Sequence, residues 1–171
     1  MLKLLTKIFG GSKSEKDVRK IKPQVDQINQ EYATFQALSH DELRAKTTEF
    51  RLQIREHLAD IQAELDECQQ QIVALPAEDI TGRDALYQTL DGLRKKKDKE
   101  IEVVLERLLP AAFAVVRETA RRFSGSEAIA STATELDREL ATKKEYITIV
   151  GDQSVFQTTW KAAGNPVRWN M

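Results

Sequence analysis

The sequence predicts a mainly α-helical fold: a long antiparallel helical hairpin, shorter helices, and a small β-hairpin near the C-terminal end. Three observations lead to this prediction. Apolar residues recur every three or four positions over most of the chain, which is the period of one helix face. Two such runs are joined by a short segment containing Pro76 and Gly82, so they should lie antiparallel. Residues 145–160 are instead rich in β-branched and aromatic types, which favours strands.

Composition and charge agree with long surface helices. Of the 171 residues, 31% are charged and only 6% are aromatic. The net charge of −1 gives no overall attraction to polyanions. Residues 1–22, however, carry seven lysine and arginine side chains against Glu15 and Asp17. This basic arm could face anionic lipid or an acidic partner, or it could simply be solvated.

The first element is a short amphipathic helix over residues 2–9, followed by a hinge at Gly10-Gly11-Ser12. Its apolar and basic side chains fall on different flanks. A helix this short is unstable alone in water and needs a surface to order it. That surface is a membrane interface, a groove on a partner, or the body of the protein itself.

Two helices should follow. The first covers about residues 17–38, and Pro23 predicts either a kink or a true start near Lys22. The second begins at Ser39, because Ser39 and Glu42 have the spacing of a capping box. Its apolar rhythm continues without a break to Ile72, which predicts a helix of about 33 residues and roughly 50 Å.

The partner arm of the hairpin comes next. Leu75-Pro76 should end the long helix, Thr81-Gly82 should turn the chain, and residues 86–108 resume the apolar seam. The lysine-rich run 94–99 reads as a solvated face, and no aromatic residue interleaves with it, so nucleic acid is not an expected partner. Cys68, the only cysteine, is expected in the core of the hairpin.

The last third changes character. Pro110 should begin a new helix that reaches about Phe123, and residues 124–134 should form a loop. Residues 145–150 and 154–160 predict a β-hairpin around Gly151, which Gly164-Asn165-Pro166 should end.

No catalytic constellation stands out. His40, expected to be exposed, and His57 make no metal-binding pattern with Cys68. The sequence contains no glycine-rich phosphate-binding loop with its lysine, so this chain alone should not hydrolyse ATP. No apolar run reaches the ~20 residues that span a bilayer, which favours a cytosolic protein or one attached to a membrane surface from that side.

Three segments, in order, resemble the amino-terminal end of the SecA family of ATP-driven protein translocases. Residues 1–10 (M-L-K-L-L-T-K-I-F-G) are similar to its leading amphipathic helix. Residues 38–51 (L-S-H-D-E-L-R-A-K-T-T-E-F-R) resemble its L-S-D-E-E-L-x-x-K-T-x-E-F-R motif, and residues 108–118 (L-L-P-A-A-F-A-V-V-R-E) resemble L-L-P-E-A-F-A-V-V-R-E. The last two motifs are specific, whereas the first alone would be weak.

The resemblance implies a domain organisation. Residues 1–12 would be a membrane- and channel-binding arm, and residues 13–123 a helical region with an inserted hairpin at about 58–104. Residues 124–171 would be a loop and β-hairpin insertion that leads into a nucleotide-binding domain. Such long forms look like SecA of the Bacteroidetes lineage. Met171 matches the first position of the family's adenine-binding motif, at the edge of the adenine pocket.

The resemblance also implies partners and cofactors. The family couples hydrolysis of ATP, with magnesium, to pushing unfolded preproteins through the SecYEG channel, from the cytoplasmic face of the inner membrane. The chain would dock to acidic phospholipids and to the channel and brace the first nucleotide-binding domain, with self-association into a homodimer as a further expectation. The docking residues would be Leu2, Lys3, Leu5, Lys7, Ile8 and Phe9. The alternative is a stand-alone coiled-coil scaffold or adaptor, which explains the long seam but not the ordered motifs.

Overall fold

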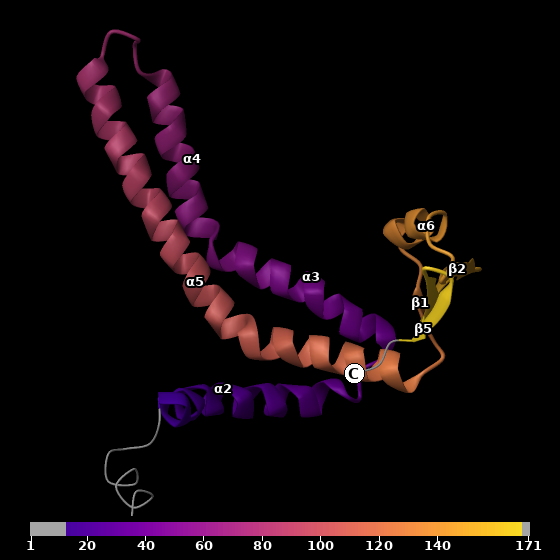
Figure 1. Ribbon diagram of the computed structural model, residues 1–171. Coiled ribbons are helices and arrows are strands. Elements are labelled where there is room, and N and C mark those ends of the chain that lie inside the picture. Colours follow the sequence, from indigo (N-terminus) through magenta and orange to yellow (C-terminus); the bar gives the residue numbers. More distant parts are fainter. Residues whose placement is uncertain (1–12, 169–171) are drawn as a thin grey trace, which may run out of the picture. The chain divides into compact units, whose positions relative to one another are not determined.

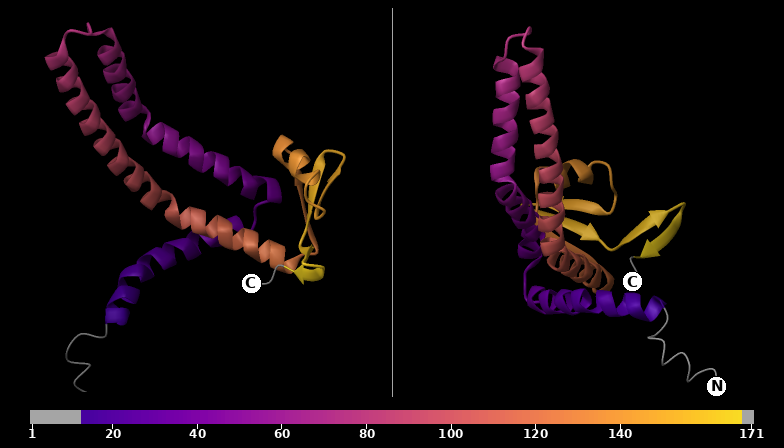
Figure 2. Two further views of the ribbon diagram at one scale, coloured as in Figure 1. Left: turned by 45° about the horizontal axis from the view of Figure 1, so that its top comes forward. Right: turned by 90° about the vertical axis from the view of Figure 1, so that its left-hand side faces the viewer.

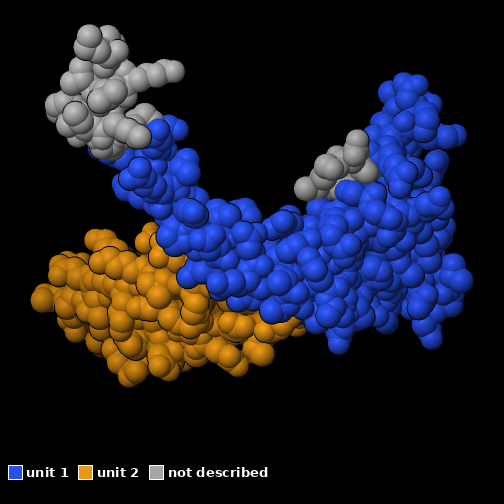
Figure 3. Space-filling view, turned by 90° about the horizontal axis from the view of Figure 1, so that it is seen from below, with its two compact units in different colours: residues 1–45, 110–171 blue, residues 46–109 orange. Residues whose placement is uncertain are grey.

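The computed structural model describes residues 13–168, which divide between two compact units (Figures 1 and 3). Unit 1 is formed from residues 1–45 and 110–171, and unit 2 from residues 46–109. Two helices, α3 (His40–His57) and α5 (Ile80–Gly125), contribute residues to both units. The prediction of a mainly helical fold with small antiparallel sheets near the C-terminal end is confirmed.

Unit 2 contains the predicted helical hairpin. Helix α4 (Ala59–Ala74) runs alongside the first half of α5 in the opposite direction, as Figures 1 and 2 show. Four buried side chains from the two helices pack together, with Leu86 and Leu93 beside them; the four are Leu65, Cys68, Ile72 and Leu90. The apolar seam read from the sequence is therefore the interior of this hairpin, and Cys68 lies within it as expected.

The loop of the hairpin is placed differently from the prediction. Helix α4 ends before Leu75, as expected, but Thr81 and Gly82 belong to the first turn of α5 instead of the turn between the helices. Asp79 explains the early start, because its Oδ1 accepts a hydrogen bond from the backbone N–H of Gly82 at 2.9 Å. A side-chain acceptor at this position satisfies one of the free N–H groups of a helix start.

The prediction of one unbroken helix from Ser39 to Ile72 is wrong. Helix α3 ends at His57 and α4 begins at Ala59, with Leu58 between them at φ −95° and ψ 0°. The hydrogen-bond ladder continues past this residue, since Leu58 N–H donates to Ile54 O at 3.1 Å and Gln62 N–H to Leu58 O at 2.9 Å. A change confined to one residue leaves the three–four spacing of apolar residues intact, so the pattern could not reveal it.

Unit 1 is built around the C-terminal end of α2 (Lys13–Phe35), the start of α3 and the last part of α5. Phe35, Leu43 and Ala114 form its buried helical cluster, one residue from each helix. Toward the N-terminal end of α2 the apolar side chains are exposed to solvent: Val18, Ile21 and Val25 are 62%, 55% and 44% exposed. Among the described residues, the seam predicted along this helix is thus packed at its C-terminal end and exposed toward its start.

Pro23 and Pro110 both lie inside helices, so the start predicted at Pro110 and the start near Lys22, one of two alternatives for Pro23, are wrong. Helix α2 begins at Lys13 and passes through Pro23, and α5 passes through Pro110 without a new start. A proline inside a helix removes one backbone hydrogen bond and normally bends or breaks it. Pro23 is solvent-exposed, so water can satisfy the carbonyl group left without its donor.

A small β module completes unit 1. Strands β1 (Ala128–Thr132), β2 (Ile147–Val150) and β3 (Gln153–Gln157) form an antiparallel sheet in the order β1-β3-β2. The predicted hairpin is confirmed as β2–β3, whereas the loop predicted over residues 124–134 is wrong because it contains β1. Helix α6 (Glu135–Ala141) lies between β1 and β2 and was not predicted.

A second hairpin follows the sheet. Strand β4 (Thr159–Ala162) pairs with β5 (Asn165–Arg168), so Trp160 lies in a new strand instead of at the end of β3. Gly164 does not end the β structure but turns it, since Ala163 and Gly164 have φ values of 49° and 83°. Two residues with positive φ form the turn that matches the twist of a tight hairpin.

Candidate functional site: the first turn of α3

The first turn of α3 is fixed by the predicted capping box. Glu42 N–H donates to Ser39 Oγ at 3.2 Å, and Ser39 N–H donates to Glu42 Oε2 at 2.7 Å. These reciprocal bonds satisfy two backbone donors and set the direction of the helix. They also determine where the next side chains point, namely His40, Asp41 and Arg44, which reach α5 and the β module within unit 1.

A buried ion pair on α5 lies next to this turn. The Glu118 side chain is fully buried and Arg122 is 8% exposed, and Arg122 Nε donates to Glu118 Oε1 at 2.7 Å. Arg121 donates to the same carboxylate from Nε at 2.8 Å and from Nη2 at 2.7 Å. The hydrogen bonds from Arg121, and then those from Arg122, lower the pKa of Glu118 against the opposing effect of burial.

Arg122 links this pair to the turn before α3. Its Nη2 donates to the carbonyl oxygen of Leu38 at 2.6 Å and to that of Phe35 at 3.4 Å. These are carbonyl groups at and just after the end of α2, which lack partners within the helix. A single guanidinium therefore ties the last turn of α2 to α5 through charge-assisted hydrogen bonds.

His40 takes the remaining arm of Arg122. Its Nδ1 lies 3.0 Å from Arg122 Nη1, and partial desolvation of the ring, followed by the charge of Arg122, lowers the pKa of His40. The neutral imidazole that results can accept this hydrogen bond at Nδ1. His40 is solvent-exposed, as predicted, and borders a hollow of about 410 Å³ together with Arg121, Arg122 and Ser126.

Arg44 makes the second polar cluster, with Asp137 of α6. Its Nη1 and Nη2 donate to the two carboxylate oxygens of Asp137 at 2.7 and 2.8 Å. The Asp137 side chain is only 3% exposed and also accepts from the Thr134 N–H and hydroxyl and from the Ser154 hydroxyl. The hydrogen bonds from Arg44 are the main reason why the pKa of Asp137 lies far below its ordinary value.

Asp41 binds the end of the neighbouring strand β1 through its carboxylate. Its two carboxylate oxygens accept from the N–H and from the hydroxyl of Thr132, each at 2.8 Å. The hydroxyl bond is the main cause of the lowered pKa of Asp41. Thr132 is the last residue of β1, so Asp41 and Arg44 together attach α3 to the β module at two adjacent points.

The chemistry of these clusters is that of attachment. Each carboxylate accepts hydrogen bonds from arginine, hydroxyl or backbone donors, as attachment contacts do. Within residues 13–168, no group of three or more histidine, cysteine or acidic side chains could hold a metal ion. No helix in the same part of the chain is long and apolar enough to cross a membrane.

The docking residues predicted from the sequence lie outside the described residues; they are Leu2, Lys3, Leu5, Lys7, Ile8 and Phe9, as well as Met171 at the other end. His57 contacts Glu100, with 2.9 Å between Nε2 and Oε2, and takes no part in the clusters of unit 1. Sequence reasoning missed Arg122 and Asp137. Asp137 had a signal, because Thr134 and Asp137 have capping-box spacing and both of the reciprocal hydrogen bonds are present.

Comparison with known proteins identifies the family. The model of the SecA DEAD-like domain matches residues 5–134. The chain is 38% identical over 167 residues to the protein translocase subunit SecA of Porphyromonas gingivalis, 41% over 170 residues to that of Christiangramia forsetii, and 39% over 171 residues to that of Cytophaga hutchinsonii. These alignments cover 98%, 96% and 100% of the chain but 15% of each relative.

No solved structure matches the chain. The relatives support the expectation of a SecA of the Bacteroidetes type. The two motifs that first suggested the family, residues 38–51 and 108–118, both fall within the matched range and supply Asp41, Arg44 and Glu118 of the clusters described above. The chain belongs to the SecA family.

Proposed function

We propose that this chain forms the docking and bracing part of an ATP-driven motor that moves unfolded preproteins through the SecYEG channel. The support is its membership of the SecA family, whose relatives carry the name protein translocase subunit. The chain spans about 15% of the length of these relatives. ATP and magnesium, the channel, the preproteins and a peripheral position on the cytoplasmic face of the inner membrane are therefore proposed for the whole motor.

The bracing role rests on one observation, the junction of the two family motifs in unit 1. Leu43 of the first motif packs with Ala114 of the second in the buried helical cluster. Glu118, at the end of the second motif, orients Arg122, which binds the carbonyl oxygen of Leu38 at the start of the first. A junction that combines apolar packing with saturated buried charges resists deformation, which is what a support for a moving domain requires.

The docking role is proposed for the amphipathic segment 2–9. Its lysines, Lys3 and Lys7, would approach lipid phosphates while Leu2, Leu5, Ile8 and Phe9 enter the interface. Each lysine near an anionic surface contributes about 1 kcal/mol, which supports reversible attachment. The exposed apolar side chains Val18, Ile21 and Val25 of α2 extend this character along the basic N-terminal region.

Co-sedimentation with lipid vesicles tests the docking role. The 171-residue chain should pellet with vesicles containing anionic lipid and not with purely zwitterionic ones. Exchanging both lysines, Lys3→Glu with Lys7→Glu, should weaken binding at least about 30-fold, since two attractive charges become repulsive. The matched control is Lys95→Glu with Lys99→Glu, which makes the same charge change on exposed residues of α5. Equal loss in both variants, or in neither, would refute specific docking by residues 2–9.

A motor assay tests the bracing role. In the full-length translocase, Arg122→Ala should lower the temperature at which ATPase activity is lost, while Arg121→Ala should leave it nearly unchanged. An unaltered inactivation temperature for Arg122→Ala would remove the bracing role. No feature of the described residues favours a stand-alone scaffold over the translocase. A scaffold function would also leave the membership of this chain in the SecA family unexplained.

A further inference from the structure

A groove lies between the β module and the β4–β5 hairpin, and it is lined by none of the residues of the α3 turn described above. It has a volume of about 900 Å³ and lies between the segment before β2 and the β4–β5 hairpin. Tyr146 lines the first wall, and Trp160 and Pro166 line the second. Trp160 and Tyr146 contact each other with ring centroids 6.4 Å apart and planes inclined at 53°. The groove is wholly within unit 1.

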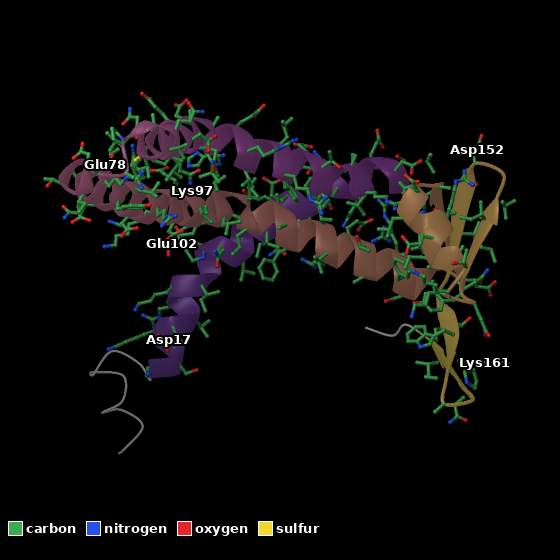
Figure 4. All side chains as sticks on the ribbon, turned by 90° about the horizontal axis from the view of Figure 1, so that it is seen from above. Asp17, Glu78, Lys97, Glu102, Asp152 and Lys161 are labelled. Carbon is green, nitrogen blue, oxygen red and sulfur yellow. The ribbon has the colours of Figure 1, made fainter. Side chains whose placement is uncertain are left out.

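The charge of this groove is positive. Lys143, Lys144 and Lys161 line it, against the single carboxylate of Glu145. Lys143 is engaged by Glu139 of α6, with 2.5 Å between Nζ and Oε1. Lys144 and Lys161 are exposed and form no ion pair with another described residue, and Figure 4 shows Lys161 on the β4–β5 hairpin. An occupant complementary to this lining carries negative charge.

Strand β4 offers a free edge beside the groove. Among residues 13–168 its one pairing partner is β5, in the register Thr159↔Arg168, Trp160↔Val167, Lys161↔Pro166 and Ala162↔Asn165. In a hairpin with a two-residue turn the flanking pair, here Ala162 and Asn165, is hydrogen-bonded, and the pairs then alternate. Lys161 therefore faces Pro166 at a non-hydrogen-bonded position, where the missing N–H of proline is tolerated.

The same alternation decides where the other backbone groups point. If Trp160 and Ala162 bond inward to β5, the N–H and C=O groups of Thr159 and Lys161 point away from it. Both of these residues line the groove. A row of outward backbone donors and acceptors is the template that an additional strand requires.

We propose that this groove binds an extended acidic segment of a partner polypeptide, which adds as a strand to the free edge of β4. Backbone hydrogen bonds to Thr159 and Lys161 supply the register, and Lys144 and Lys161 select acidic side chains. Single-stranded nucleic acid fits less well, because the inclined rings of Tyr146 and Trp160 present no parallel faces for successive bases. This binding site does not depend on the translocase function proposed above.

Fluorescence anisotropy with defined peptides tests the proposal. The probe is a labelled peptide of about eight residues that alternates glutamate and valine, at low salt where exposed charges act strongly. The chain should bind it, and Lys144→Glu with Lys161→Glu should weaken binding about tenfold or more. The matched control, Lys95→Glu with Lys99→Glu in unit 2, should bind as the unaltered chain does. All four lysines are exposed, so the fold should survive, and circular dichroism verifies it.

Two further probes separate the alternatives. A peptide N-methylated at alternate amides keeps its charge but loses strand hydrogen bonds, so its binding should be several-fold weaker. A lysine–valine peptide should not bind. The proposal is overturned if the glutamate–valine peptide fails to bind, or binds equally to the groove and control variants. Equal binding of the N-methylated or lysine peptide, or binding of an oligothymidine in place of the acidic peptide, would also overturn it.

Discussion

Arg44 and Asp137 face each other as a two-pronged pair, with both guanidinium amino groups donating to both carboxylate oxygens at 2.7 and 2.8 Å. They are far apart in the sequence, one in the second turn of α3 and the other in the first turn of α6. The carboxylate is buried and the guanidinium is partly exposed. This pair is thus one of the contacts that attach the β module to the helices of unit 1, beside the hydrogen bonds between Asp41 and Thr132.

Removing the guanidinium should loosen the β module. In Arg44→Ala the buried Asp137 keeps its charge but loses its main partner, and we expect a loss of about 2–4 kcal/mol in the free energy of unfolding. Arg44→Lys should cost less, because a point charge restores attraction without the second hydrogen bond. Urea unfolding followed by tryptophan fluorescence measures both. The control is Lys143→Ala, since the Lys143–Glu139 pair is exposed and should contribute under about 1 kcal/mol.

The same pair predicts a pH dependence. The Arg44 guanidinium holds the pKa of Asp137 below the value of about 3.9 that an aspartate has in an unfolded chain. A depressed pKa contributes stability that is complete above the unfolded value and is lost as the pH falls toward the folded one. The difference in unfolding free energy between the unaltered chain and Arg44→Ala should thus be constant above about pH 5 and shrink toward pH 2. A difference independent of pH over this range would contradict the assignment.

Two adjacent arginines that bind one carboxylate should differ in importance. Arg122 is buried and also binds two backbone carbonyl oxygens, whereas the Arg121 side chain is 55% exposed. We expect Arg122→Ala to lower the free energy of unfolding by about 3 kcal/mol and Arg121→Ala by under about 1 kcal/mol. Thermal melting of the two variants, made in the same background, compares them directly. Equal losses would mean that the carbonyl contacts at the end of α2 contribute little.

The turn of the β4–β5 hairpin leaves room for stabilisation. Ala163 has φ 49°, a conformation that costs alanine energy and that asparagine adopts readily. The variant Ala163→Asn creates the asparagine–glycine pair that this type of turn prefers. We expect a gain of about 0.5–1 kcal/mol in hairpin stability. Slower amide hydrogen exchange at Trp160 and Val167, the inner hydrogen-bonded pair, would show it; Gly164→Ala should have the opposite effect.

Local signals in the sequence were enough to locate most of the fold. The spacing of Ser39 and Glu42 located a helix start, and the three–four rhythm around Leu65 and Leu90 located the hairpin interior. The errors came where tertiary context overrides a local rule. Pro110 is a strong start signal, yet α5 passes through it. The turn at Leu58 is invisible to periodicity because the backbone hydrogen bonds persist across it.

The candidate site was harder to predict for a different reason. Arg44 and Asp137 are brought together by the tertiary fold, and no local sequence pattern around either residue indicates that the other is its partner. Arg122 lies four residues after Glu118, but the same spacing of an acidic and a basic residue is common on exposed helix surfaces. What distinguishes the pair is the burial of both side chains, which depends on the packing of α2 and α3 around α5.

Cys68 gives the hairpin of unit 2 a natural reporter. It is the sole thiol of the chain, it is 5% exposed, and it lies among the side chains that hold α4 against α5. Thiol-specific reagents modify the deprotonated sulfur only when solvent reaches it. The rate at which such a reagent labels the unaltered chain therefore measures how often α4 and α5 separate. In this chain it can be read without a fluorescent tag or an engineered residue.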